Sequence, residues 1–135
     1  MSIRKPYSLG KSERLKSRKQ IDHLFEKGKK ITLFPFRILF LLEKSGGIVK
    51  AGFTVSSKNF PRAVDRNRIK RLTREAYRLQ KKEMEEAVVK NDYSLHLFFI
   101  YTGREIPVDE EISVSLRKLL DKLLKILNEK DPANT

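Results

Sequence analysis

Two periodicities of apolar residues divide the chain into helices and strands. Helical spacing predicts a short first helix of about three turns, with Ser17 as its N-cap and Gly28 as its C-terminal cap. A second helix is expected from Val64 toward Val89, and a third after Pro107, where acidic residues occupy the first turn. The third helix carries an apolar stripe that we assign to the core and not to a partner-binding face. The stripe comprises Ile112, Leu116, Leu119, Leu120, Leu123, Ile126 and Leu127.

Alternating apolar residues predict strands between the first two helices. Pro35 splits the segment that starts at Lys30 into two short strands, and Gly46-Gly47 forms a turn before a third strand over residues 48–56. An apolar run over residues 95–101 predicts a fourth, buried strand. The predicted order is αβββαβα, an α+β fold in which a four-stranded sheet is covered by helices in a two-layer α/β sandwich. The succession of strand, helix and strand favours parallel pairing of the last two strands.

The length of 135 residues fits one domain, which we place at residues 18–129 between a flexible basic arm (residues 1–17) and a frayed tail (residues 130–135). The absence of cysteine excludes disulfides and thiolate metal sites such as zinc fingers, and it fits a reducing compartment. No secretory segment is apparent, and the apolar runs are too short to span a bilayer. We therefore expect a cytoplasmic protein without membrane contact.

Charge is distributed unevenly along the chain. Residues 1–82 contain 23 cations and 6 anions, for a net charge of +17, whereas residues 83–135 contain 7 and 11, for a net charge of −4. This asymmetry predicts a polyanion-binding surface in the first two thirds of the chain and a structural role for the last third. Nucleic acid is the leading candidate for the partner.

The cations of residues 66–78 follow the helical period. At 3.6 residues per turn, one side of the helix carries a row at spacing four, with Tyr77 at its edge. The row consists of Arg66, Lys70, Arg74 and Arg78, with Asn67 and Arg71 beside it, and the opposite apolar side consists of Ile69, Leu72, Ala76 and Leu79. Such a helix can bury its apolar side and hold its cations toward phosphates. The alternative, a solvated structural helix, is disfavoured because six cations in this stretch face a single acid, Glu75.

Residues suited to protein catalysis are scarce. His23 and His96 have no partner at ligand or relay spacing, and the glutamates of residues 83–86 and 110–111 resemble solvated helix charges. A nuclease that acts without RNA is therefore disfavoured. A binding role is better supported, because Arg, Lys and Asn side chains can contact phosphate, sugar, base or a hydrated metal ion.

Residues 63–75, Ala-Val-Asp-Arg-Asn-Arg-Ile-Lys-Arg-Leu-Thr-Arg-Glu, closely resemble the signature of the bacterial ribonuclease P protein component when taken with residues 52–56, Gly-Phe-Thr-Val-Ser. The similarity extends from about residue 11 to residue 128 and includes Arg14-Leu15, residues 21–25 and Gly28. It implies a left-handed βαβ crossover around the basic helix, as in the second domain of a small-subunit ribosomal protein, contrary to the right-handed default.

The resemblance also implies the function and the residues that carry it. Members of the family join a catalytic RNA that removes the 5′ leader of precursor tRNA with divalent metal ions such as Mg²⁺, and the protein would be a monomeric subunit of a 1:1 ribonucleoprotein. The residues that would face the catalytic RNA and the metal-rich region are Arg66, Asn67, Arg68, Lys70, Arg71 and Arg74, with Lys58 and Arg62 on the adjoining loop. Asn67 would contact a metal ion only through the water molecules bound to that ion. Ile21, Phe25, Phe36 and Leu39 would form the leader cleft.

The chain departs from the family pattern at three positions. Ile21 stands where an aromatic residue is common, Leu39 where Tyr occurs, and Ser57 where a second Lys often precedes Lys58. We expect leader stacking to be weaker or shifted as a result. The main hypothesis is a ribonuclease P protein subunit that assists RNA-catalysed cleavage, and the alternative is a non-catalytic ribosomal or RNA-chaperone protein that uses the same basic helix.

Overall fold

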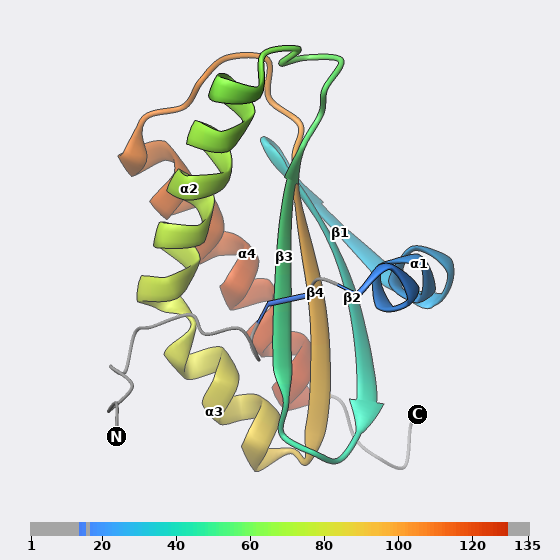
Figure 1. Ribbon diagram of the computed structural model, residues 1–135. Coiled ribbons are helices and arrows are strands. Elements are labelled where there is room, and N and C mark those ends of the chain that lie inside the picture. The colour runs from blue at the N-terminus through green and yellow to red at the C-terminus, as the bar shows by residue number, and fades with distance from the viewer. Residues whose placement is uncertain (1–13, 16, 130–135) are drawn as a thin grey trace, which may run out of the picture.

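The computed structural model describes residues 14, 15 and 17–129, and it confirms the predicted order of helices and strands except that the second helix is divided in two (Figure 1). The remainder of the predicted arm and the predicted tail lie outside the described residues. The elements are α1 (Arg18–Lys27), β1 (Lys29–Leu33), β2 (Phe36–Lys44), β3 (Val49–Val55), α2 (Ala63–Gln80), α3 (Lys82–Lys90), β4 (Tyr93–Tyr101) and α4 (Asp109–Glu129).

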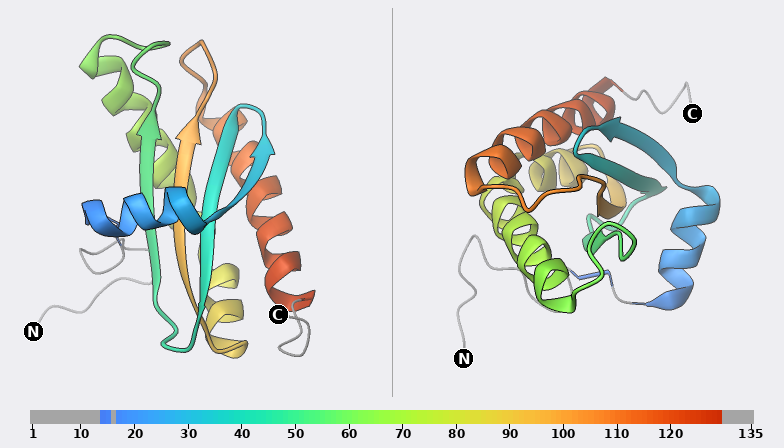
Figure 2. Two further views of the ribbon diagram at one scale, coloured as in Figure 1. Left: turned by 90° about the vertical axis from the view of Figure 1, so that its right-hand side faces the viewer. Right: turned by 90° about the horizontal axis from the view of Figure 1, so that it is seen from above.

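The four strands form one sheet in the order β1-β2-β4-β3. Strand β4 pairs antiparallel with β2 and parallel with β3, so α2 and α3 lie within a crossover between parallel strands. In the left panel of Figure 2, β3 and β4 both point upward, β4 lies to the right of β3, and α2 lies behind the sheet. The crossover is therefore left-handed, which confirms what the family resemblance implied and opposes the general rule.

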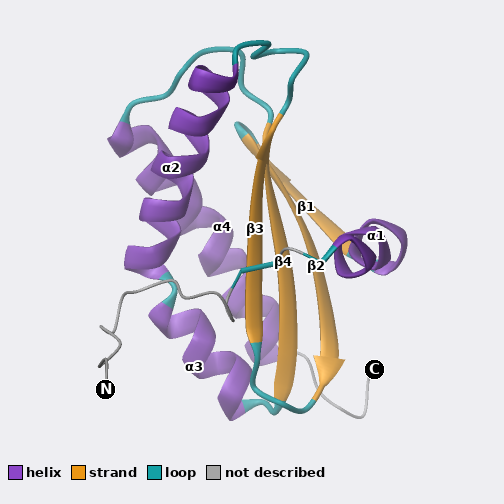
Figure 3. Ribbon diagram, viewed as in Figure 1, coloured by secondary structure: helices purple, strands orange, loops and turns teal. Residues whose placement is uncertain are grey.

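Helices cover the two faces of the sheet unequally (Figure 3). The main core lies between the sheet and α2, α3 and α4, and it includes the alternate residues Phe36, Ile38 and Phe40 of β2. The apolar stripe of α4 is part of this core, as predicted. Its residues Ile112, Leu116, Leu119, Leu120, Leu123 and Leu127 are buried, and Ile126 is half-buried.

A smaller core lies on the opposite face, where α1 crosses β2 and β4. Its buried residues are Leu15, Leu24, Leu39 and Phe98. The Leu15 amide donates a hydrogen bond of 2.9 Å to the Ala51 carbonyl, so this part of the predicted arm belongs to the domain. Gly52 leaves room for the smaller core, because a Cβ atom there would lie 2.7 Å from the Phe98 ring and 3.2 Å from the Leu15 carbonyl oxygen.

The second predicted helix is divided into α2 and α3 at Lys81, whereas the sequence pattern predicted one helix through this point. Both Lys81 and the end of α2 are tied to neighbouring groups. The Lys81 ammonium is buried 3.6 Å from a Glu85 carboxylate oxygen. The Gln80 side-chain amide donates to the Ser113 carbonyl of α4 at 3.2 Å. Beyond the break, α3 buries Met84, Ala87 and Val88.

The buried side of α2 is rotated from the predicted apolar stripe. Leu79, predicted to be buried, is 53% exposed, and Tyr77, predicted at the edge of the cationic side, is buried. Thr73 is also buried, and its hydroxyl avoids the cost of burial because it donates to the Ile69 carbonyl at 2.8 Å. The Tyr77 ring packs edge-on against Phe53. Thr73 and Tyr77 therefore occupy interior positions that the hydrophobic pattern did not predict for them.

This rotation predicts unequal stability losses for two residues of the same predicted stripe. Ile69→Ala should lower the free energy of unfolding by about 2–5 kcal/mol, because it leaves a cavity in the main core. Leu79→Ala should change it by less than about 0.5 kcal/mol. Urea denaturation of both variants is the measurement, and equal losses would show that Leu79 is buried in solution.

Candidate nucleic-acid interface

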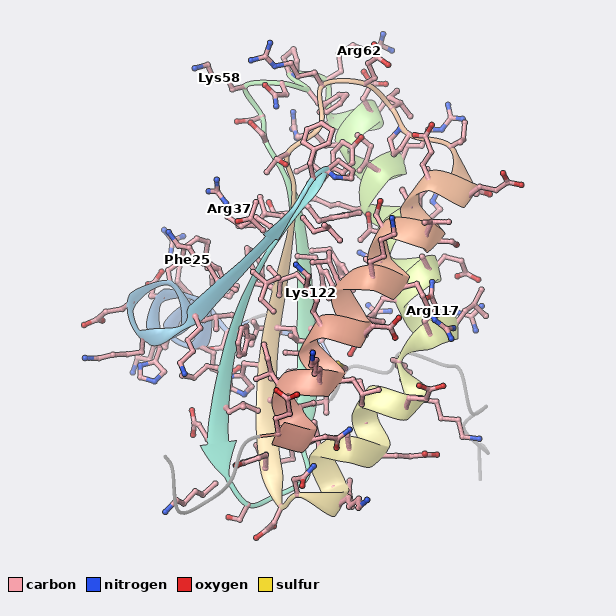
Figure 4. The ribbon with its side chains drawn as sticks, turned by 180° about the vertical axis from the view of Figure 1, so that it is seen from behind. Phe25, Arg37, Lys58, Arg62, Arg117 and Lys122 are labelled. Carbon is pink, nitrogen blue, oxygen red and sulfur yellow. The ribbon has the colours of Figure 1, made fainter. Side chains whose placement is uncertain are left out.

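Cations surround the N-terminus of α2, where the exposed backbone N–H groups already carry partial positive charge. Arg62 is the N-cap residue, and its side chain makes no capping hydrogen bond. Asp65 is the acid in the first turn, and its carboxylate lies 3.8 Å from the Arg62 guanidinium. Lys58 is exposed on the preceding loop, and Figure 4 shows Lys58 and Arg62 at the same end of the molecule. An anion would relieve this accumulation of positive charge.

Arg66 holds the loop before α2 in place. Its guanidinium donates hydrogen bonds of 2.8 Å to the Phe60 carbonyl and 2.7 Å to the Pro61 carbonyl. Phe60 itself is buried, and its amide donates to the Ser56 carbonyl at 3.0 Å. The sequence placed Arg66 in an outward row of cations, but the structure uses it to fix the loop that carries Lys58.

The other members of the predicted row lie beside the buried side of α2. Lys70 and Arg74 are half-buried, and the Arg74 guanidinium carbon lies 5.8 Å from the centre of the Phe53 ring. Arg78 forms a salt bridge with Glu75, which holds the pKa of that carboxyl below its usual value. Among the residues of α2 that were predicted to contact RNA, the exposed ones are Asn67, Arg68 and Arg71, which we call the outward stripe. The helical period predicted that these cations and Asn67 share a surface, but not which of them face outward.

A second surface lies where α1 crosses the sheet. Phe25 of α1 is 53% exposed, and its ring packs edge-on against Phe98 with the ring centres 5.5 Å apart. Ile21 packs against the smaller core and is half-buried. Phe25 therefore presents an accessible aromatic face that is held by a second ring, as predicted for a residue that contacts single-stranded nucleic acid.

One residue predicted for this cleft lies on the wrong face of the sheet. Phe36 is buried in the main core, whereas Leu39 faces α1 as predicted but is buried beneath it. The error follows from the pleat of the strand, because residues an odd number of positions apart on a strand point to opposite faces. Phe36 and Leu39 could not both have faced α1.

The same alternation identifies residues that the sequence reasoning missed. Arg37 lies two positions from Leu39 on β2, and it pairs with Ile100, which lies two positions from Phe98 on β4. Thr54 of β3 pairs with Ile100 from the other side. Arg37 is exposed, and Figure 4 shows it on the same side of the sheet as Phe25. Alternation along the strand places Arg37 on the same face as Leu39, which the sequence alone could show. Which residues of β4 lie next to Arg37 depends on the register between β2 and β4.

The histidines form no catalytic arrangement among the described residues. Burial lowers the pKa of His96 below its ordinary value; Lys50 and His23 lower it further, and Glu43 opposes them. His23 is exposed on α1. Over residues 14, 15 and 17–129 there is no cluster of three or more His, Cys, Asp or Glu side chains that could hold a metal ion. In the same part of the chain, no helix is long and apolar enough to cross a membrane.

Comparisons with known proteins agree with this geometry. A family model described as Ribonuclease P matches residues 9–126. A ribonuclease P protein component from Porphyromonas gingivalis strain W83 is 33% identical over 119 residues, which cover 87% of each chain. The ribonuclease P protein component of Chlorobaculum tepidum is 35% identical over 135 residues, which cover 92% of this chain and 88% of the relative.

A solved structure shows the same fold. The Staphylococcus aureus RNase P protein superposes with a TM-score of 0.66 over 84% of this chain and 96% of the other, at 21% sequence identity. At this level of identity the likeness supports the fold alone, and the sequence relatives carry the evidence for the family.

The anchoring role of Arg66 can be separated from its charge by amide hydrogen exchange. Arg66→Ala should speed exchange of the amides at residues 57–60 by roughly fivefold, since the loss of two charged hydrogen bonds destabilises the closed loop by about 1 kcal/mol. Arg68→Ala, which removes an exposed cation from the same helix, is the matched control. Equal protection in the two variants would contradict the anchoring role.

Proposed function

The chain belongs to the ribonuclease P protein family, and on this premise we propose that it binds the catalytic RNA of ribonuclease P through the outward stripe and the N-terminus of α2. As a protein component of this endoribonuclease it has an RNA partner within a ribonucleoprotein. We further propose a monomeric subunit in a 1:1 complex that acts in the cytoplasm.

The observation that carries the RNA-binding proposal is the arrangement of cations around α2. Asn67, Arg68 and Arg71 project from the side opposite the main core, while Lys58 and Arg62 lie at the positive end of the helix. Forked guanidinium groups and free N–H groups at a helix end suit phosphate oxygens. The core on the opposite side of α2 fixes the backbone of the helix, so little backbone ordering remains to oppose binding.

We propose that the surface beside α1 binds the single-stranded 5′ leader of precursor tRNA. Phe25 supplies an aromatic face for a base, and the exposed Arg37 on the same side of the sheet supplies a cation for the backbone. Ile21 contributes apolar contact in place of the aromatic residue expected from the family. This surface can discriminate precursor from mature tRNA, because only the precursor carries a leader.

We propose that catalysis resides in the RNA, and that its Mg²⁺ ions activate water and stabilise the charge on the scissile phosphate. The exposed Asn67 amide is suited to the waters of a hydrated ion, because it offers both a donor and an acceptor. Direct coordination would favour carboxylates, and the exposed carboxylate on this side of α2, Glu75, is already paired with Arg78.

Reconstitution with a bacterial ribonuclease P RNA tests the function. Added protein should permit cleavage of precursor tRNA at magnesium concentrations where the RNA alone is inactive. Asn67→Ala should raise the magnesium midpoint, whereas Arg117→Ala, which alters an exposed cation on α4, should not. No effect of the wild-type protein on cleavage would reject the proposal. Binding of ribosomal RNA in its place would indicate an RNA chaperone.

The leader surface predicts a selective defect for Phe25→Ala. Loss of one stacked base, about 1–3 kcal/mol, should weaken precursor tRNA binding by roughly 5- to 100-fold while leaving mature tRNA binding unchanged. Phe25→Tyr retains an aromatic face and is the control. Filter binding of precursor and mature tRNA to the holoenzyme measures the ratio. An equal loss for both tRNAs would place the effect outside the leader.

A further inference from the structure

An open hollow of about 790 Å³ lies at the end of the sheet, apart from the surface beside α1. Its walls are the turn between β1 and β2 and the segment that joins β4 to α4. They include Phe34, Pro35, Tyr101, Glu105, Ile106 and Glu111. Phe34 is 76% exposed at the rim. Ile106 and Val108, which also line the hollow, are exposed as well, and an exposed apolar patch of this kind indicates a binding surface.

The two walls are held together by hydrogen bonds. The Thr102 amide and hydroxyl donate to the Pro35 carbonyl at 2.7 and 3.0 Å, which fixes the turn that carries Phe34 against the end of β4. The Tyr101 hydroxyl donates to the Glu105 carbonyl at 2.8 Å, which fixes the other wall. The hollow is therefore formed before any partner binds, and binding requires little ordering.

The hollow adjoins the loop that precedes α2. The Asn59 side-chain amide of that loop donates to the Gly103 carbonyl at 3.4 Å, and the Phe60 and Tyr101 rings lie with their centres 6.1 Å apart. The loop also carries the exposed cations Lys58 and Arg62. An RNA bound at the N-terminus of α2 would consequently lie next to the wall of the hollow that Tyr101 and Gly103 form.

The loop and the hollow differ in charge, so they suit different parts of a nucleotide. Arg104 is the cation among the lining residues, against the carboxylates of Glu105 and Glu111. Burial raises the pKa of the Tyr101 hydroxyl, and Glu111 and Glu105 raise it further, so both carboxylates act on the same ring hydroxyl. A net negative lining repels phosphate but accepts a neutral base, whose amino groups can donate to carboxylate oxygens.

We propose that this hollow binds an unpaired base of the catalytic RNA, stacked on Phe34, while the adjoining phosphates contact Lys58 and Arg62. The inference rests on the proposed function only in taking that RNA as the partner. The catalytic RNA is favoured over the leader because Tyr101, the aromatic ring of β4 that lines the hollow, belongs to the main core, on the face of the sheet opposite α1. A leader held beside Phe25 would lie on the other face.

A single tryptophan can report on the hollow because the chain contains none. Phe34→Trp should retain stacking, and its fluorescence should fall to a saturating minimum as ribonuclease P RNA is added to the full chain. The matched control is Val89→Trp, an exposed position on α3 at the opposite end of the molecule, and its fluorescence should not change. A single-stranded oligoadenylate of about ten nucleotides should quench Phe34→Trp, whereas an abasic strand of equal length and charge should not.

Affinity provides a second readout. Phe34→Ala should weaken binding to the catalytic RNA by roughly 5- to 100-fold, and Phe34→Leu, which keeps apolar bulk without a ring, should weaken it similarly. The inference is overturned if Phe34→Trp binds the RNA without quenching, if the abasic strand quenches equally, or if quenching requires precursor tRNA. The first of these results leaves the proposed function intact, whereas failure of the wild-type protein to bind the RNA rejects the function itself.

Discussion

Strand β4 is the constraint on which both surfaces depend. It pairs with β2 on one side and β3 on the other, and its side chains alternate between the two cores. Leu97, Phe99 and Tyr101 pack under α2 and α4, whereas Phe98 packs under α1. The parallel pairing with β3 forces the chain to cross the sheet through α2, which places the basic helix on one face. The same strand supports Phe25 on the other face through the Phe98 ring.

The cations of α2 divide into those that build the surface and those that face solvent. Arg66 secures the preceding loop, Arg74 lies over the Phe53 ring, and Arg78 pairs with Glu75. Asn67, Arg68 and Arg71 remain exposed at positions that these contacts make rigid. Charge of one sign can be concentrated here because the stability of α2 comes from Ile69, Thr73 and Tyr77 on the opposite side.

Much of the fold was predictable because periodicity reports burial directly. The Leu stripe of α4, the division of the first strands at Pro35 and the parallel pairing were all predicted from the sequence and confirmed. The errors arose where tertiary contacts override hydrophobicity. Thr73 could be buried only through its bond to Ile69, and the face occupied by Phe36 depended on the strand register. The hollow beside Phe34 was not predictable, since segments distant in sequence form it.

The difference in size between the two cores has a dynamic consequence. The layer formed by Leu15 and α1 is attached through a core of only four buried residues in the described chain, whereas the other face of the sheet is covered by three helices. The free energy needed to detach a structural unit scales with the apolar contacts that it loses, so α1 can separate from the sheet while the rest of the domain stays folded. Partial unfolding of this layer would separate Phe25 from the Phe98 ring, so the aromatic surface beside α1 would be lost without any change in the position of α2.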